Sequence, residues 1–169
     1  MHWIETVRIE LVLLVDRLSL RRPRLVSQRK GTAVVEFALG SGVLLAAFSG
    51  AFEFGYALIQ YNKLESAVAQ GARYASMLPY DSTTETPSAT FLSAVQNMVL
   101  YGSPSAGNAP TLNGLTTGNI NLVVTFSNGV PSSVEISVTG YTINALFGSF
   151  TLNGKPRVTY SYQGVWAPV

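Results

Sequence analysis

The sequence of 169 residues contains no cysteine and a single histidine, His2. The absence of cysteine excludes disulfides, thiolate metal sites and cysteine nucleophiles. Charged residues make up only 12% of the chain, whereas soluble domains carry about a quarter. This shortage of charge is typical of a chain that is anchored in a membrane or that forms an assembly.

Groups that perform catalysis are also scarce. The acidic residues beyond position 60 are scattered, at Glu65, Asp81, Glu85 and Glu135. A serine or threonine nucleophile would lack a base, isolated carboxylates do not define a metal cage, and no phosphate-binding loop with a following Lys-Ser/Thr is present. We therefore expect neither an enzyme nor a cofactor or metal site.

Residues 32–59 form one apolar run whose only formal charges are Glu36 and Glu53. As a helix this run would extend roughly 40 Å, which exceeds the hydrocarbon thickness of about 30 Å. We predict a transmembrane helix, with Glu53 near its outer interface.

Charge is unevenly distributed around this run. Residues 1–30 hold seven basic and three acidic residues, a formal charge of +4, and the rest of the chain has a charge of −2. A basic flank favours a cytoplasmic N-terminus and an extracytoplasmic C-terminal part. The competing interpretation of Arg21-Arg22-Pro23-Arg24 is a nucleic-acid site, but basic residues beside a span more often set topology, so we expect no nucleic-acid partner. The apolar cluster Ile9–Val15 is too short to span a bilayer; an interfacial helix, a long leader and a start site assigned too early all fit it.

The junction before the apolar run holds the most specific pattern. Arg29 and Lys30 precede Gly31, and Glu36 follows that glycine by five residues inside the apolar helix. The arrangement resembles the processing site of type IV prepilins, in which cleavage after Gly31 would leave Thr32 as the first residue. Glycine suits such a site because it adopts extended backbone readily and lets a protease approach closely.

Glu36 is costly in an apolar helix, at about 2.5–3.5 kcal/mol on insertion scales. In one interpretation it snorkels to the headgroups and is stabilised by the helix dipole. In the other, which the resemblance to pilins implies, it pairs with the N-terminal amine of a neighbouring subunit. The spacing from Gly31 favours pairing.

Small residues recur at helical spacing within the run. One stripe holds Gly42, Ala46 and Gly50, and an adjacent stripe holds Ala47, Ala51 and Gly55. Such stripes allow transmembrane helices to pack closely, although small residues are also common in membrane helices generally. From residue 60 to 78 the pattern becomes amphipathic and predicts that the helix continues outside the membrane until Pro79.

Three blocks resemble the TadE-like proteins of tight-adherence (Flp-type) pilus systems. They are GTAVVEFAL at 31–39, FEFGY at 52–56 and AVAQGARYAS at 67–76, the last containing Gly71, Ala72, Arg73 and Tyr74. Gly42 stands where the family commonly has a proline, so a proline kink is not assumed. Arg73 is either a solvated charge or the partner of a carboxylate.

The resemblance implies a minor pilin or pseudopilin of the inner membrane, cleaved by a prepilin peptidase and needed for fibre assembly. Its partners would be other pilins, pseudopilins and the pilus assembly machinery. The alternative is an uncleaved, single-pass binding module whose helix only tethers an outer domain.

The outer region predicts an α+β fold. We expect a linker at 79–87, a second helix from Pro87 to Tyr101 capped by Thr86 and ended by Gly102, and an exposed loop at 103–118. Strands are predicted at 119–126, 133–141 and 157–163, with a turn at Asn128-Gly129 that Pro131 lengthens and an apolar crossover at 141–150. The predicted organisation is a leader at 1–31, a transmembrane helix at 32–59, its extension at 60–78 and a small domain at 79–169.

Overall fold

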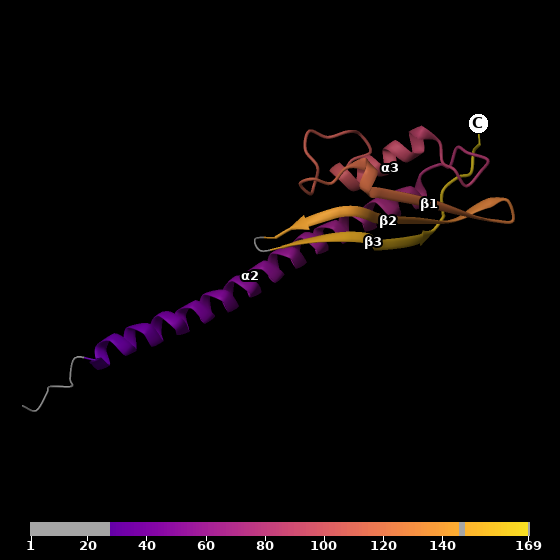
Figure 1. Ribbon diagram of the computed structural model, residues 1–169. Helices are drawn as coiled ribbons and strands as arrows, with labels where there is room; N and C mark the ends of the chain where they lie inside the picture. The colour runs from indigo at the N-terminus through magenta and orange to yellow at the C-terminus, as the bar shows by residue number, and fades with distance from the viewer. Residues whose placement is uncertain (1–27, 146–147, 169) are drawn as a thin grey trace, which may run out of the picture. The chain divides into compact units, whose positions relative to one another are not determined.

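The computed structural model describes residues 28–145 and 148–168. The chain divides into two compact units between Phe48 and Ser49. The described part of the first unit is helical, and the second unit contains the rest of that helix, a shorter helix and a three-stranded antiparallel sheet. This is the predicted α+β fold, with its elements labelled in Figure 1. The Ile9–Val15 cluster and the basic residues Arg21, Arg22 and Arg24 lie outside the described residues.

The long helix α2 is Gln28–Met77, so the predicted continuity of the apolar run with the amphipathic segment is confirmed. From Leu64 onward one face of α2 is buried. The buried positions recur at spacings of three and four, which is the pattern that predicted an amphipathic helix here. They are Leu64, Ala67, Val68, Gly71, Ala72, Ala75 and Ser76.

The second helix, α3, is Ala89–Tyr101 and begins later than the sequence predicted. Its cap is Ser88, whose hydroxyl accepts a hydrogen bond from the Phe91 amide at 3.1 Å, and not Thr86. Ser88 also donates to Asp81 Oδ2 at 2.6 Å. The end at Gly102 is as predicted: its φ of 69° is the left-handed conformation that glycine adopts without steric cost.

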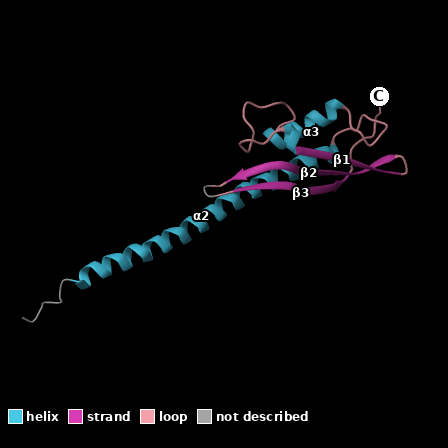
Figure 2. Ribbon diagram, in the orientation of Figure 1, coloured by secondary structure: helices cyan, strands magenta, loops and turns pink. Residues whose placement is uncertain are grey.

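The sheet has the order β1-β2-β3 (Figure 2), with β1 Ile120–Ser127, β2 Val130–Asn144 and β3 Ser149–Ser161. Asn128 and Gly129 alone join β1 to β2, both at positive φ, so the prediction of a longer hairpin was wrong. Pro131 lies inside β2 beside an irregularity in the register with β1, beyond the part of β2 that pairs with β3. A missing N–H is tolerated there because no β3 residue lies opposite.

The predicted crossover at 141–150 was also wrong. Tyr141 to Asn144 end β2, and Ser149 and Phe150 begin β3, so the two strands form a hairpin whose residues 146–147 lie outside the described ones. The sequence does not predict the first part of β3, because Asn153, Gly154 and Pro156 are residues typical of turns. They fit inside β3 because the register shifts, with Asn153 opposite Thr139 and Arg157 opposite Ser137.

The core lies between one face of the sheet and the two helices. Val134, Ile136 and Val138 of β2 face it, and Phe91, Val95 and Val99 of α3 complete it. Residues 79–87 are the predicted linker between α2 and α3, although Tyr80 within them is fully buried. The loop predicted to be exposed is so over most of its length, but it buries Leu112 and Leu115 before a 3-10 turn at Thr117–Asn119.

Candidate assembly and membrane surface on α2

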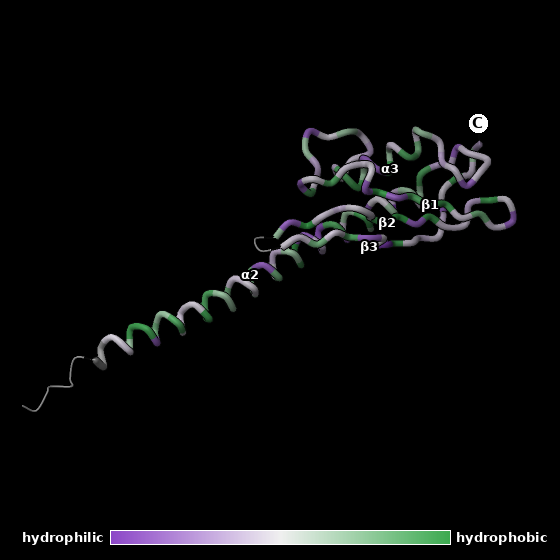
Figure 3. Tube along the Cα trace, in the orientation of Figure 1, coloured by the Kyte–Doolittle hydropathy of each residue, from purple (hydrophilic) through white to green (hydrophobic). Residues whose placement is uncertain are grey.

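The first part of α2 is coloured largely as hydrophobic in Figure 3, and its large apolar side chains are exposed. Thirteen large apolar residues between Val34 and Ile59 are exposed by 44–77%. They are Val34, Val35, Phe37, Leu39, Val43, Leu44, Leu45, Phe48, Phe52, Phe54, Tyr56, Leu58 and Ile59. A helix that is apolar all round is stable only where protein or lipid surrounds it.

Gly31 and Thr32 lie within α2, near its first residue, Gln28. Their backbone is therefore helical and not extended. The first four N–H groups of a helix have no partner within it, so this end is the part that opens most readily. Glu36 follows four residues after Thr32 and is exposed.

The two stripes of small residues lie on exposed helix. A Cβ added at Gly42, Gly50 or Gly55 would meet nothing within 4 Å. Ala46, Ala47 and Ala51 are exposed as well. Gly55, at the end of the second stripe, is instead half-buried, and the predicted role of the stripes in helix packing stays a prediction.

The block from Gly71 to Tyr74 has a divided role. Gly71 and Ala72 are buried, and a Cβ on Gly71 would overlap Val99 Cγ2 of α3. Tyr74 is half-buried against the core. Arg73 is exposed, and none of the described carboxylates lies within ion-pair distance of it. Three of the four residues in this block therefore pack in or against the core, and only Arg73 is exposed.

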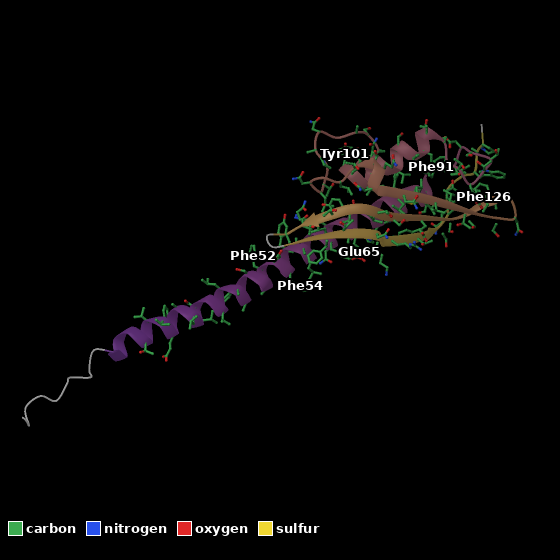
Figure 4. The ribbon with its side chains drawn as sticks, viewed as in Figure 1. Phe52, Phe54, Glu65, Phe91, Tyr101 and Phe126 are labelled. Atoms are coloured by element: carbon green, nitrogen blue, oxygen red, sulfur yellow. The ribbon has the colours of Figure 1, made fainter. Side chains whose placement is uncertain are left out.

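An aromatic cluster around Tyr80 was missed by the sequence analysis. The Tyr80 ring centroid lies 5.1 Å from that of Phe91, 5.7 Å from Phe126 and 6.3 Å from Tyr162, each pair edge to face. The Tyr80 hydroxyl donates to the Thr84 carbonyl at 2.6 Å and that of Tyr162 to the Leu78 carbonyl at 2.8 Å. Burial raises the pKa of both tyrosines above 10.0. Figure 4 labels Phe91 and Phe126.

The C-terminal segment fixes this cluster in place. The Tyr80 amide donates to the Val165 carbonyl and the Ala167 amide donates to the Tyr80 carbonyl, both at 2.9 Å. Trp166 Nε1 donates to the Ser82 carbonyl at 3.0 Å. These contacts join residues more than 80 positions apart, so no local pattern in the sequence predicts them.

The face of the sheet opposite the core is polar. Arg157 Nε lies 3.3 Å from Glu135 Oε1, and the Thr159 hydroxyl donates to Glu135 Oε2 at 3.2 Å. Among residues 28–145 and 148–168, no three His, Asp or Glu side chains gather as metal ligands would. The described residues of this face therefore offer a surface on which another protein segment could pack.

Among the residues that the structure describes, one helix, Gly31–Met77, is long and apolar enough to cross a membrane, which fits a single-pass membrane protein. Residues 31–73 match the family model of TadE-like proteins, so the resemblance predicted from the three blocks is confirmed over that segment. Neither the curated proteins nor the solved structures give a match.

Proposed function

We propose that this chain is a membrane-anchored minor pilin or pseudopilin that acts in the assembly of a tight-adherence type IV (Flp) pilus. One observation supports it above the others: the TadE-like match begins at Gly31, where the predicted processing site lies, and continues along the exposed apolar helix. A helix that is apolar on every side can stay in lipid or pack among similar helices. A pilus subunit needs both environments, because it is stored in lipid before assembly and packs against other helices in the fibre.

In this proposal a prepilin peptidase cleaves between Gly31 and Thr32. The new amine of Thr32 then lies near Glu36 of a neighbouring subunit, and their opposite charges stabilise each other in an apolar surrounding. The N-terminus is cytoplasmic and the domain beyond the span is extracytoplasmic. Other pilins and the assembly machinery are the partners, and the chain has no catalytic or cofactor role.

The test is the mass of the mature protein purified from native membranes. We expect Thr32 as its first residue, and we expect Gly31→Leu to retain the leader. Gly40→Leu is the matched control, because Gly40 lies in the same helix with open space around it. Retention of Met1 in wild-type protein, or unchanged processing of the Gly31→Leu protein, would contradict the proposal.

The second candidate is an uncleaved binding module that the helix tethers to the membrane. The helical backbone at Gly31 and Thr32 favours it, because a protease binds extended chain and this end of α2 would have to unwind first. A full-length mature protein that assembles into no fibre would support this candidate.

A further inference from the structure

The strand β2 runs along α2 in the opposite direction. Gly71 of α2 lies near Ile136 of β2, since a Cβ on this glycine would contact Ile136 Cδ1 at 3.4 Å. Further along, Tyr56 of α2 lies close enough to Tyr141 of β2 to influence it electrostatically. The two separations are about 22 Å along the helix and about 17 Å along the strand, which differ by about three helical residues. The C-terminal end of β2 is therefore the end that lies nearer to the apolar part of α2.

On this scale the paired ends of β2 and β3 lie beside residues 52–55 of α2, because the two reference pairs give the two ends of that range. Ile143, paired with Phe150, is two residues beyond Tyr141, a further distance of about 7 Å or four to five helical residues. Burial along α2 agrees, because its sheet-facing residues are half-buried from Glu53 through Ala57 to Tyr61. The neighbouring Phe52 and Phe54 are exposed by 77% and 71% (Figure 4).

The apolar run is longer than the hydrocarbon that it has to cross. Twenty residues span about 30 Å, and the twenty from Ala33 to Phe52 contain Glu36 as their only charge. Glu53 then falls at the outer boundary, where a carboxylate reaches the headgroups. The residues in excess, 53–59, are those that lie alongside the hairpin.

Phe150 is the most exposed large apolar residue among the described residues of the three strands, at 58%. Among its described neighbours, Asn144 and Ser149 are exposed and the Thr142 and Thr151 hydroxyls are hydrogen-bonded at 2.9 Å, whereas the sequence at 145–147 is apolar, Ala-Leu-Phe. An aromatic ring among polar groups is the composition that suits the interface between lipid and water.

We infer that the paired ends of β2 and β3 at Ile143 and Phe150 lie in the outer headgroup region of the membrane, with Phe150 in contact with lipid beside Phe52 and Phe54 of α2. The occupant of this patch is lipid, because the patch is continuous with the exposed apolar surface of the candidate span. The hairpin cannot lie deeper, since β3 is an edge strand whose unpaired backbone groups need water or headgroups. A second lipid contact beside the helix would fix the rotation of the outer domain about the helix axis.

The inference rests on the membrane anchoring in the proposed function. It is tested in full-length protein reconstituted into vesicles of phosphatidylethanolamine and phosphatidylglycerol. Because the chain has no cysteine, Phe150→Cys, Leu44→Cys and Val130→Cys each place one nitroxide label. Val130 is the matched control: it is apolar and 43% exposed, and it lies at the other end of β2, about 40 Å from Ile143.

Collisions of each label with oxygen and with a water-soluble nickel chelate measure its depth. We expect the chelate to reach the Phe150 label several-fold less often than the Val130 label, with oxygen reaching it more often, provided that the circular dichroism spectra match. If the Leu44 label lies in lipid while the Phe150 label matches Val130, the hairpin inference is wrong and the anchoring stands. If the Leu44 label lies in water, the anchoring and the hairpin inference both fail.

Discussion

Gly71 of α2 lies so close to Val99 of α3 that no Cβ fits between the two helices without overlapping the valine Cγ2. The same glycine faces Ile136 of β2, so it lies where both helices and the sheet meet. The family-matched segment thus includes Gly71, which packs inside the fold, two positions before the exposed Arg73.

The close approach predicts a penalty for the smallest possible side chain. Gly71→Ala should lower the free energy of unfolding through overpacking, by about 1–3 kcal/mol, against a gain of about 1 kcal/mol from better helix propensity. Thermal unfolding of the detergent-solubilised chain measures the difference. Gly55→Ala is the control, because it brings the same propensity gain in the same helix with nothing within 4 Å of the new Cβ.

A double-mutant cycle separates the clash from other effects. In a Val99→Ala background the obstructing Cγ2 atom is gone, so the penalty of Gly71→Ala should shrink by at least about 0.5 kcal/mol. Equal penalties in the two backgrounds would show that Val99 is not what limits the space at Gly71.

The strongest sequence predictions came from long, regular patterns. The apolar run and the amphipathic segment after it predicted α2, and Gly102 predicted the end of α3. The predictions failed where irregular local geometry decides the structure. Only the second half of β3 was predicted as a strand, at 157–163; the missed first half contains Asn153, Gly154 and Pro156, and only its register with β2 shows how a strand accommodates them.

Tyr80 could not be recognised from its neighbours in the sequence. Pro79 and the polar residues after Tyr80 indicate a linker, and the groups that bury the ring belong to α3, β1 and the C-terminal segment. For the membrane surface the situation is reversed. Composition alone predicted the apolar run, and the structure adds which of its residues lie beside the sheet.

Stability should fall in alkali because of three tyrosines. Burial raises the pKa of Tyr80, Tyr141 and Tyr162 above the ordinary 10.0. Above pH 10 the unfolded chain loses these protons before the folded chain does, so the folded state binds more protons and its stability decreases as pH rises. Below pH 10 the contribution is fully present. Unfolding midpoints measured from about pH 8 to about pH 11.5 should decline in the upper part of the range.

Substitution to phenylalanine identifies the groups responsible. Tyr141→Phe should flatten the alkaline decline, and it should cost about 0.5–1.5 kcal/mol at neutral pH because the hydrogen bond from its hydroxyl to the Asn113 carbonyl, 3.1 Å long, is lost. An alkaline slope unchanged in both Tyr80→Phe and Tyr141→Phe would assign the decline to other groups.

The ion pair between Arg157 and Glu135 should contribute little to stability. The two side chains are 56% and 27% exposed, so water screens the attraction at 3.3 Å. Arg157→Ala should cost no more than about 1 kcal/mol, and less in high salt. Chemical denaturation at low and high ionic strength measures this, and a loss above about 2 kcal/mol at both would mean that Arg157 stabilises the sheet by packing.

Glu36 provides the sharpest separation between insertion and assembly. Glu36→Gln removes the charge, so it should enter the membrane at least as well as wild type, because an uncharged amide costs less than a carboxylate in an apolar helix. If Glu36 pairs with a neighbour's amine, the same change should abolish fibres while carbonate extraction still finds the protein in the membrane. Glu65→Gln is the matched control, since Glu65 is exposed on the amphipathic part of the same helix (Figure 4). Normal fibres from the Glu36→Gln protein would leave the carboxylate with only an interfacial role, because its charge would then be dispensable for subunit pairing.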